Sequence, residues 1–132
     1  MALKVDPVPQ TLSSDSVSHR WFEQVRRMLN DIYLDGGLYP RHTITATAVT
    51  LTDAYHYVYC NCTSNVITVN LPAVSTVARR LFVIKKIDST GNAVTIDGSG
   101  AETIDGATTK TISSQYSVTA IQAGATEWHI VN

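Results

Sequence analysis

The hydrophobic positions of this chain follow two different periods, and the change falls near residue 42. Between residues 17 and 33, apolar side chains recur every three or four residues, which predicts one amphipathic helix. From Thr43 onward the period is two, in short runs separated by Gly, Asn, Asp and Pro. The pattern predicts a mainly β protein: a β-sandwich or jelly-roll-like body of short antiparallel strands, preceded by an extended arm and one helix.

This change of period divides the chain into two regions. Residues 1–40 are predicted to be an N-terminal arm and helix that serve attachment or oligomerisation, and residues 41–132 the β-sandwich body. Pro7 and Pro9 favour an extended arm. Ser16 is a suitable N-cap, and the run Asp35-Gly36-Gly37 is predicted to end the helix.

The apolar stripe of the predicted helix is the main candidate binding surface. One helix has too little apolar surface to form a core by itself, so it packs on its own β body, on another copy or on a partner. Aromatic residues and methionine are frequent anchors at interfaces, which favours intermolecular burial over packing on the chain's own body. The predicted partner-binding residues are Val17, Trp21, Phe22, Val25, Met28, Leu29 and Ile32.

Several turns and one central strand are predicted within the β body. Residues 95–98 read Thr-Ile-Asp-Gly, and the same four residues recur at 103–106. Asp-Gly after an alternating pair is a strong hairpin signal, so two successive tight turns are expected. The run from Leu81 to Ile84 is apolar on both faces, which predicts a central strand.

Composition and charge narrow the possible partners. The formal net charge of −1 gives no global field that would recruit nucleic acid or an anionic membrane. The chain has no window of 18 uninterrupted apolar residues, so no membrane span is predicted. Its N-terminus lacks the apolar core of a secretory signal. These features predict a protein that is made and assembled in a cytoplasm and contacts neither nucleic acid nor membrane. The basic pairs at 79–80 and 85–86 are expected on solvated faces or in salt bridges at subunit contacts.

No catalytic constellation is recognisable, and neither a metal nor another cofactor is expected. His56, Cys60 and Cys62 share one predicted strand face and are either a metal-binding cluster or small buried side chains; a zinc site needs about four ligands, so we favour buried thiols. The acidic residues Asp97, Glu102 and Asp105 are either a glycosidase-like carboxylate pair or turn residues that accept backbone hydrogen bonds. We favour the turn interpretation, and with it a protein that is not an enzyme.

Aromatic side chains on the predicted strands are a second candidate surface. They can stack on sugar rings, but they more often anchor a core or a subunit interface, because they bury a large area and keep a polar tip. The candidates for a glycan or subunit interface are Tyr55, Tyr57, Tyr59 and Tyr116, of which the first three are expected on one strand face.

The C-terminal half resembles a β module of tailed-bacteriophage virion proteins. The resemblance covers about 65 residues and rests on the order and spacing of several short motifs. They read apolar-Leu-Pro, apolar-Lys-Lys-x-Asp, Thr-Ile-Asp-Gly and a terminal Trp-His, within residues 66–73, 81–88, 92–96, 103–106 and 124–131. The resemblance implies a fibre, decoration or cement subunit, usually trimeric.

Together these observations predict a virion structural protein. The expected function is a small trimeric capsid cement or head-decoration subunit, whose partners are its own copies and the major capsid protein or other virion proteins. The alternative is a tail or head fibre adhesin that binds a host-surface glycan.

Overall fold

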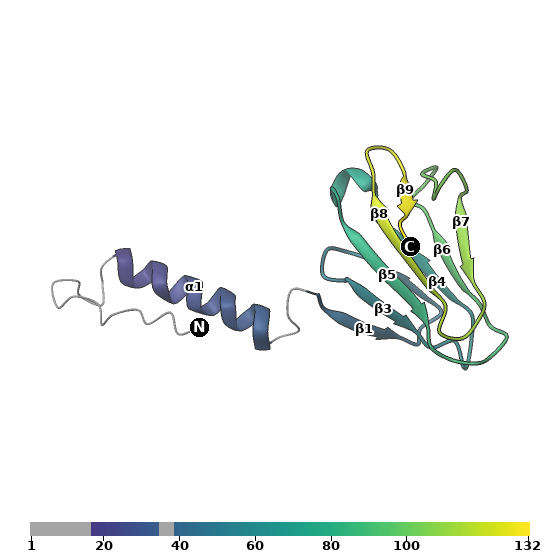
Figure 1. Cartoon of the computed structure of the whole chain (residues 1–132), viewed down its shortest axis with the longest axis horizontal. Coiled ribbons are helices and arrows are strands. Elements are labelled where there is room, and N and C mark those ends of the chain that lie inside the picture. Colours follow the sequence, from purple (N-terminus) through teal and green to yellow (C-terminus); the bar gives the residue numbers. More distant parts are fainter. Residues whose placement is uncertain (1–16, 35–38) are drawn as a thin grey trace. The chain divides into compact units, whose positions relative to one another are not determined.

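The computed structural model describes residues 17–34 and 39–132. The chain divides into two compact units, residues 1–38 and residues 39–132, and each is described by itself. In the first unit, helix α1 (Val17–Leu34) is 18 residues long (Figure 1). The predicted arm and the predicted cap residues at both helix ends lie outside the described residues.

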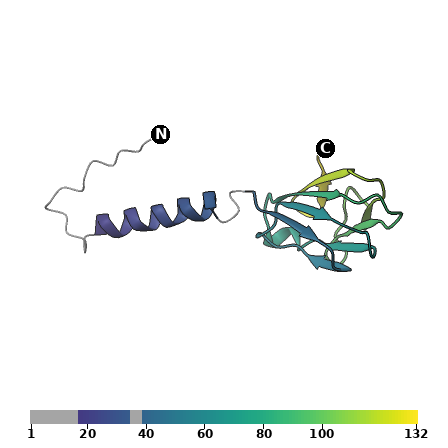
Figure 2. The ribbon, with the colours of Figure 1, turned by 90° about the horizontal axis from the view of Figure 1, so that it is seen from below.

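The second unit is a body of short strands arranged in two sheets (Figures 1 and 2). The mainly β prediction with one preceding helix is therefore confirmed. The elements of the body are β1 (Arg41–Ile44), β2 (Ala48–Thr50), β3 (Tyr57–Cys60), β4 (Ile67–Asn70), the 3-10 helix η1 (Val74–Thr76), β5 (Leu81–Lys86), β6 (Val94–Asp97), β7 (Thr109–Ile112), β8 (Val118–Ala123) and β9 (Trp128–Ile130).

Strand pairing differs from the antiparallel prediction. Sheet A has the order β1-β3-β5-β8-β9, and sheet B has the order β2-β4-β6-β7. The first six strands alternate between the two sheets, and the pairs among them, β1–β3, β3–β5, β2–β4 and β4–β6, are all parallel. The antiparallel pairs are β5 with β8, β6 with β7 and β8 with β9. A period of two shows which face a residue occupies but not which strand lies beside it, and for this reason the antiparallel prediction is wrong for the pairs among the first six strands, so both sheets are mixed.

The core lies between the two sheets and is made of residues from the body. Its fully buried members come from both sheets, including Val58 and Ile84 of sheet A and Val69 and Ile96 of sheet B. The Phe82 and Trp128 rings pack together, with centroids 5.5 Å apart. The predicted central strand is confirmed, because β5 occupies the middle of sheet A.

The two Asp-Gly pairs behave differently. Asp105 and Gly106 have φ of 47° and 82°, and Ile104 and Ala107 exchange both backbone hydrogen bonds around them, which is the predicted tight turn. Gly98 instead begins the long connection from β6 to β7, and a Cβ there would overlap the carbonyl oxygen of Glu102. The first hairpin prediction is therefore wrong: glycine is needed there for a close backbone approach and not for a turn.

Candidate functional site

The apolar stripe of α1 is exposed in the structure. Trp21 and Met28 are 57% and 54% exposed, and Phe22 and Leu29 are also exposed, whereas Val25 is half-buried. The Trp21 and Phe22 rings meet edge to face with centroids 5.1 Å apart. For Val17 and Ile32 the structure describes only the helical backbone. Exposed aromatic and methionine side chains on one helix face are typical of a surface that another molecule covers.

The spacing of this stripe fits a bundle of helices. Trp21, Val25 and Met28 are four and three residues apart, as are the seam positions of a heptad. Phe22 and Leu29 lie beside that seam and widen it to three of seven positions, the width typical of a helix that packs in a bundle or against a globular body. The opposite face carries charge, with an Arg26–Glu23 ion pair of 2.6 Å.

The body presents two outer faces of different chemistry. On sheet A, one cross-strand row runs Arg41, Tyr57, Val83 and Ala120, and the next runs Thr43, Tyr59, Lys85 and Val118. On sheet B, the outward positions are almost all short polar residues: Ala48, Thr50, Thr68, Asn70, Thr95, Asp97, Thr109 and Thr111. A solvated sheet face is polar, as sheet B's is, so the aromatic face of sheet A is the second candidate binding surface.

The candidate tyrosines do not all share this face. Tyr57 and Tyr59 point outward from β3. Tyr116 is 63% exposed, and the Lys85 ammonium lies 5.4 Å from its ring centroid. Tyr55 precedes β3 and packs against the core, with the His42 ring 4.5 Å away. The expectation that Tyr55 shares the face of Tyr57 and Tyr59 is wrong, because the strand begins only at Tyr57.

The predicted basic pairs are split between solvent and interior. Lys85 lies on the outer face of sheet A, whereas Lys86 is 0% exposed, which corrects the expectation of a solvated or intersubunit lysine. Arg79 is exposed, but the half-buried Arg80 donates hydrogen bonds to the backbone carbonyls of Asp53, at 2.6 Å, and Tyr55.

A polar network compensates the buried charge of Lys86. Its ammonium donates to the Asp88 carboxylate at 2.6 Å and to the carbonyl oxygens of Asp88 and Thr90. The same carboxylate accepts from the Cys62 N–H and from the backbone and hydroxyl of Thr90. Burial by itself raises the pKa of Asp88, but these hydrogen bonds outweigh it and hold the pKa well below its usual range. The carboxylate is therefore ionised and structural.

Both cysteines are buried free thiols. Burial raises the pKa of Cys60 to about 12, with smaller contributions from the neighbouring Cys62 and Asp88, so this thiol stays protonated. Among the described residues, no group of three His, Cys, Asp or Glu side chains is placed to hold a metal ion. Burial and the nearby Arg80 lower the pKa of His56, which packs between the Tyr39 and Tyr57 rings.

Most of the acidic residues near the predicted turns accept backbone hydrogen bonds. Glu102 accepts from the Val74 N–H at 3.1 Å, at the start of η1, and Asp105 accepts from the Ile130 N–H at 3.3 Å. Glu127 accepts from the Thr103 hydroxyl and the Gly106 N–H, and these bonds lower its pKa. Asp97 lies at the end of β6 on the outer face of sheet B. Glu102 and Asp105 thus accept backbone hydrogen bonds, as the favoured interpretation expects, but from distant segments of the chain and not within their own turns.

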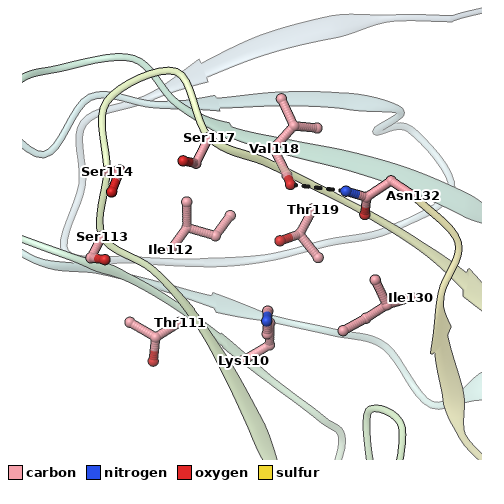
Figure 3. A pocket seen from close by; sticks show the side chains of 10 residues that line it. All are labelled: Lys110, Thr111, Ile112, Ser113, Ser114, Ser117, Val118, Thr119, Ile130 and Asn132. Carbon is pink, nitrogen blue, oxygen red and sulfur yellow. Dashed lines mark hydrogen bonds between the residues drawn. The ribbon is translucent and has the colours of Figure 1, made fainter.

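A groove of about 350 Å³ opens between β7 and the start of β8 (Figure 3). Hydroxyl groups dominate its wall, and the Asn132 amide donates to the Val118 carbonyl oxygen at 3.3 Å. No histidine or carboxylate side chain is among its lining residues, so the groove has no acid–base pair. It is lined by Lys110, Thr111, Ile112, Ser113, Ser114, Ser117, Val118, Thr119, Ile130 and Asn132.

In the described part of the chain, no helix is both long and apolar enough to cross a bilayer.

Two surfaces of the described residues are suited to binding, the α1 stripe and the outer face of sheet A. A comparison of the sequence with protein-family models and with curated proteins finds no match to either.

Proposed function

We propose that this protein is a structural subunit of a tailed-bacteriophage virion, a small trimeric cement or decoration protein of the head. In this proposal the helix α1 gathers copies of the chain and fastens them to the capsid, and the β body forms the projecting part. The proposal rests on the sequence resemblance for the class of particle, and on the helix for the mode of assembly.

The observation that carries the proposal is the exposed stripe of α1. Burying a large apolar side chain is worth about 1.5–3 kcal/mol, so Trp21, Phe22, Met28 and Leu29 offer a substantial gain to whatever covers them. The body has a core of its own, whose buried members run from Leu51 to Trp128. The stripe is therefore available for assembly, and its three-of-seven width suits a bundle of more than two helices.

The proposed mechanism is mass action and involves no covalent chemistry. A subunit that binds only the assembled shell stabilises that shell by its binding free energy. Threefold symmetry strengthens weak contacts with the shell. A trimer leaves the shell only when all three of its contacts are broken at once, so it dissociates far more slowly than a single subunit.

The mass of the full-length protein in solution tests the assembly step. Sedimentation equilibrium should give three times the 14.4 kDa of one chain. The double variant Trp21→Glu, Met28→Glu places charge in the stripe and should sediment as one chain. Arg27→Glu, on the charged face of the same helix, is the matched control and should remain a trimer. A monomeric wild type would contradict the trimer.

Binding to particles tests the location. Shells assembled without the protein should take up the wild type and the Arg27→Glu control at many symmetric sites. The stripe variant should bind much less. Uptake at only a few tail sites would contradict the cement function, and equal uptake of the stripe variant would contradict the attachment role of the helix.

A further inference from the structure

The outer face of sheet A is built around one lysine between two tyrosine rings. Lys85 of β5 is the cross-strand partner of Tyr59 on β3, and its ammonium lies 5.4 Å from the ring centroid of Tyr116. The Arg41 guanidinium lies 5.9 Å from the Tyr59 ring. Two rings and two cations thus cluster at one end of the face.

Tyr116 is held in place although its side chain is exposed. Its φ of 63° is unusual for an aromatic residue, and glycine or asparagine would be more easily accommodated there. Its N–H donates to the Lys86 carbonyl oxygen at 2.8 Å, and the Lys86 N–H donates to the Ser117 carbonyl oxygen at 3.1 Å. The connection between β7 and β8 is therefore fastened to β5 on both sides of the residue, which presents a preorganised ring to solvent.

The charges on this face are of one sign. Arg41 and Lys85 point outward, and none of the outward positions on the five strands of sheet A carries a carboxylate. Within the described residues, neither cation forms a salt bridge. A partner that complements the face is therefore anionic, and the same face of a second copy would bring like charges together.

The size of the face limits the partner further. Four strands at about 4.8 Å spacing span roughly 14 Å, and each contributes two or three outward residues, so the patch measures a few hundred Å². A stable protein interface needs about 800 Å² per partner. Nucleic acid is recognised by a longer track of cations than these two. Two or three pyranose rings match the area, and their C–H faces pack on tyrosine rings because the face of an aromatic ring is electron-rich.

We propose that the outer face of sheet A binds an acidic saccharide, whose rings stack on Tyr59 and Tyr116 and whose carboxylate accepts hydrogen bonds from Lys85 and Arg41. This site shares no residue with the α1 stripe, so it stands or fails separately from the proposed cement function.

Matched pairs of acidic and neutral sugars test the proposal on the full-length protein. The pairs are 3′-sialyllactose with lactose, and trigalacturonic acid with its methyl ester, each titrated by NMR. The acidic member of at least one pair should bind with a Kd of about a millimolar, and its neutral counterpart at least about tenfold more weakly, because it lacks the charge-assisted hydrogen bonds. Binding of neither acid, or equal binding of acid and neutral sugar, would overturn the proposal.

Two variants and two controls locate the site. Lys85→Gln keeps the reach of the side chain and should remove the preference for the acidic sugar, and Tyr116→Ala should weaken its binding about tenfold or more. The controls Thr95→Ala, on the outer face of sheet B, and Lys110→Gln, in the hydroxyl-lined groove, should bind as the wild type does. Circular dichroism would verify that each variant is folded.

The remaining outcomes also decide the matter. If the affinity for the acidic sugar is unchanged in both Lys85→Gln and Tyr116→Ala, the sugar binds elsewhere on the protein. A tighter interaction of the same residues with single-stranded oligonucleotide would identify nucleic acid as the partner. A dilution-dependent mass that Tyr116→Ala reduces to one chain would show that a second copy covers the face. Each of these three results would overturn the saccharide proposal.

Discussion

The helix and the β body treat their large apolar side chains in opposite ways. In the body, Phe82 and Trp128 are fully buried and pack on each other. In α1, Trp21 and Met28 are more than half exposed. The body thus buries its large hydrophobic residues within one chain, whereas the proposed function assigns those of the helix to contacts with other molecules. Stability and association should accordingly depend on different residues and respond to different substitutions.

The same contrast holds for charge. The Lys86–Asp88 ion pair of the body is buried and held by a network of further hydrogen bonds. The Arg26–Glu23 pair of α1 lies at the surface, where such pairs contribute little. Buried charges are costly when one partner is removed, so the body should be far more sensitive to charge substitutions than the helix.

The largest effect is expected from Lys86→Met. This substitution leaves the Asp88 carboxylate buried without its cation, and the free energy of unfolding should fall by about 3–5 kcal/mol. The neighbouring Lys85→Met, on the outer face of the same strand, is the matched control and should change it by less than about 0.5 kcal/mol. Urea denaturation measures both. Similar losses in the two variants would contradict the assignment of the buried charge to Lys86.

Acid should destabilise the body through Asp88. Because the pKa of Asp88 is lower in the folded than in the unfolded chain, the carboxylate contributes stability at pH values above its ordinary pKa of 3.8. This contribution is lost as the pH falls below that value. Urea unfolding followed between pH 7 and pH 2 should show the decline, and Asp88→Asn should flatten it. An equally steep decline in Asp88→Asn would assign the acid sensitivity to other groups.

A smaller effect is expected at the one confirmed Asp-Gly turn. Gly106 has a φ of 82°, so Gly106→Ala should cost about 1 kcal/mol of stability through backbone strain. Gly91 lies in open space without a positive φ, and Gly91→Ala should be neutral or stabilise the protein by about 0.4–1 kcal/mol. Thermal unfolding of the pair measures the difference. The oligomer mass should be unchanged in both variants.

The smallest effect on unfolding is expected from removal of the helix itself. A protein of residues 39–132 keeps every buried core residue, so its free energy of unfolding should lie within about 0.5 kcal/mol of the value for the body in the full chain. It should be monomeric if the helix drives assembly. A large loss of stability would show that the body needs the helix to complete its core, and the contrast between the two regions would disappear.

The outer faces of the body could be predicted only in part. The alternation in β3 correctly placed Tyr57 and Tyr59 on one face, because side chains alternate along any strand whatever its partners. It wrongly added Tyr55, because the strand begins two residues later. That Lys85 and Tyr116 lie beside them could not be predicted, because 30 residues separate the two in sequence and only the β5–β8 pairing brings their segments together.

The pair at 85–86 shows the same limit. Its sequence indicates opposite faces of a strand, but burial of a lysine is unfavourable without compensation, so a solvated position was the reasonable expectation. The compensation comes from Asp88 and Thr90 along the chain and from the backbone of Cys62 on a different segment. The closeness of Asp88 and Thr90 to Lys86 in the sequence indicates part of this network. It does not indicate that Lys86 is buried, which is what makes the network necessary.

By itself, the sequence determined what local periodicity encodes: one amphipathic helix with its apolar stripe, a mainly β remainder, a central strand at 81–84 and a tight turn at 105–106. Only the tertiary structure decided which strands are neighbours, that the first six alternate in parallel between two sheets, and which lysine is buried. The physical reason is that side-chain alternation and turn propensity depend on adjacent residues, whereas sheet order and the desolvation of a charge depend on contacts between segments far apart in the chain.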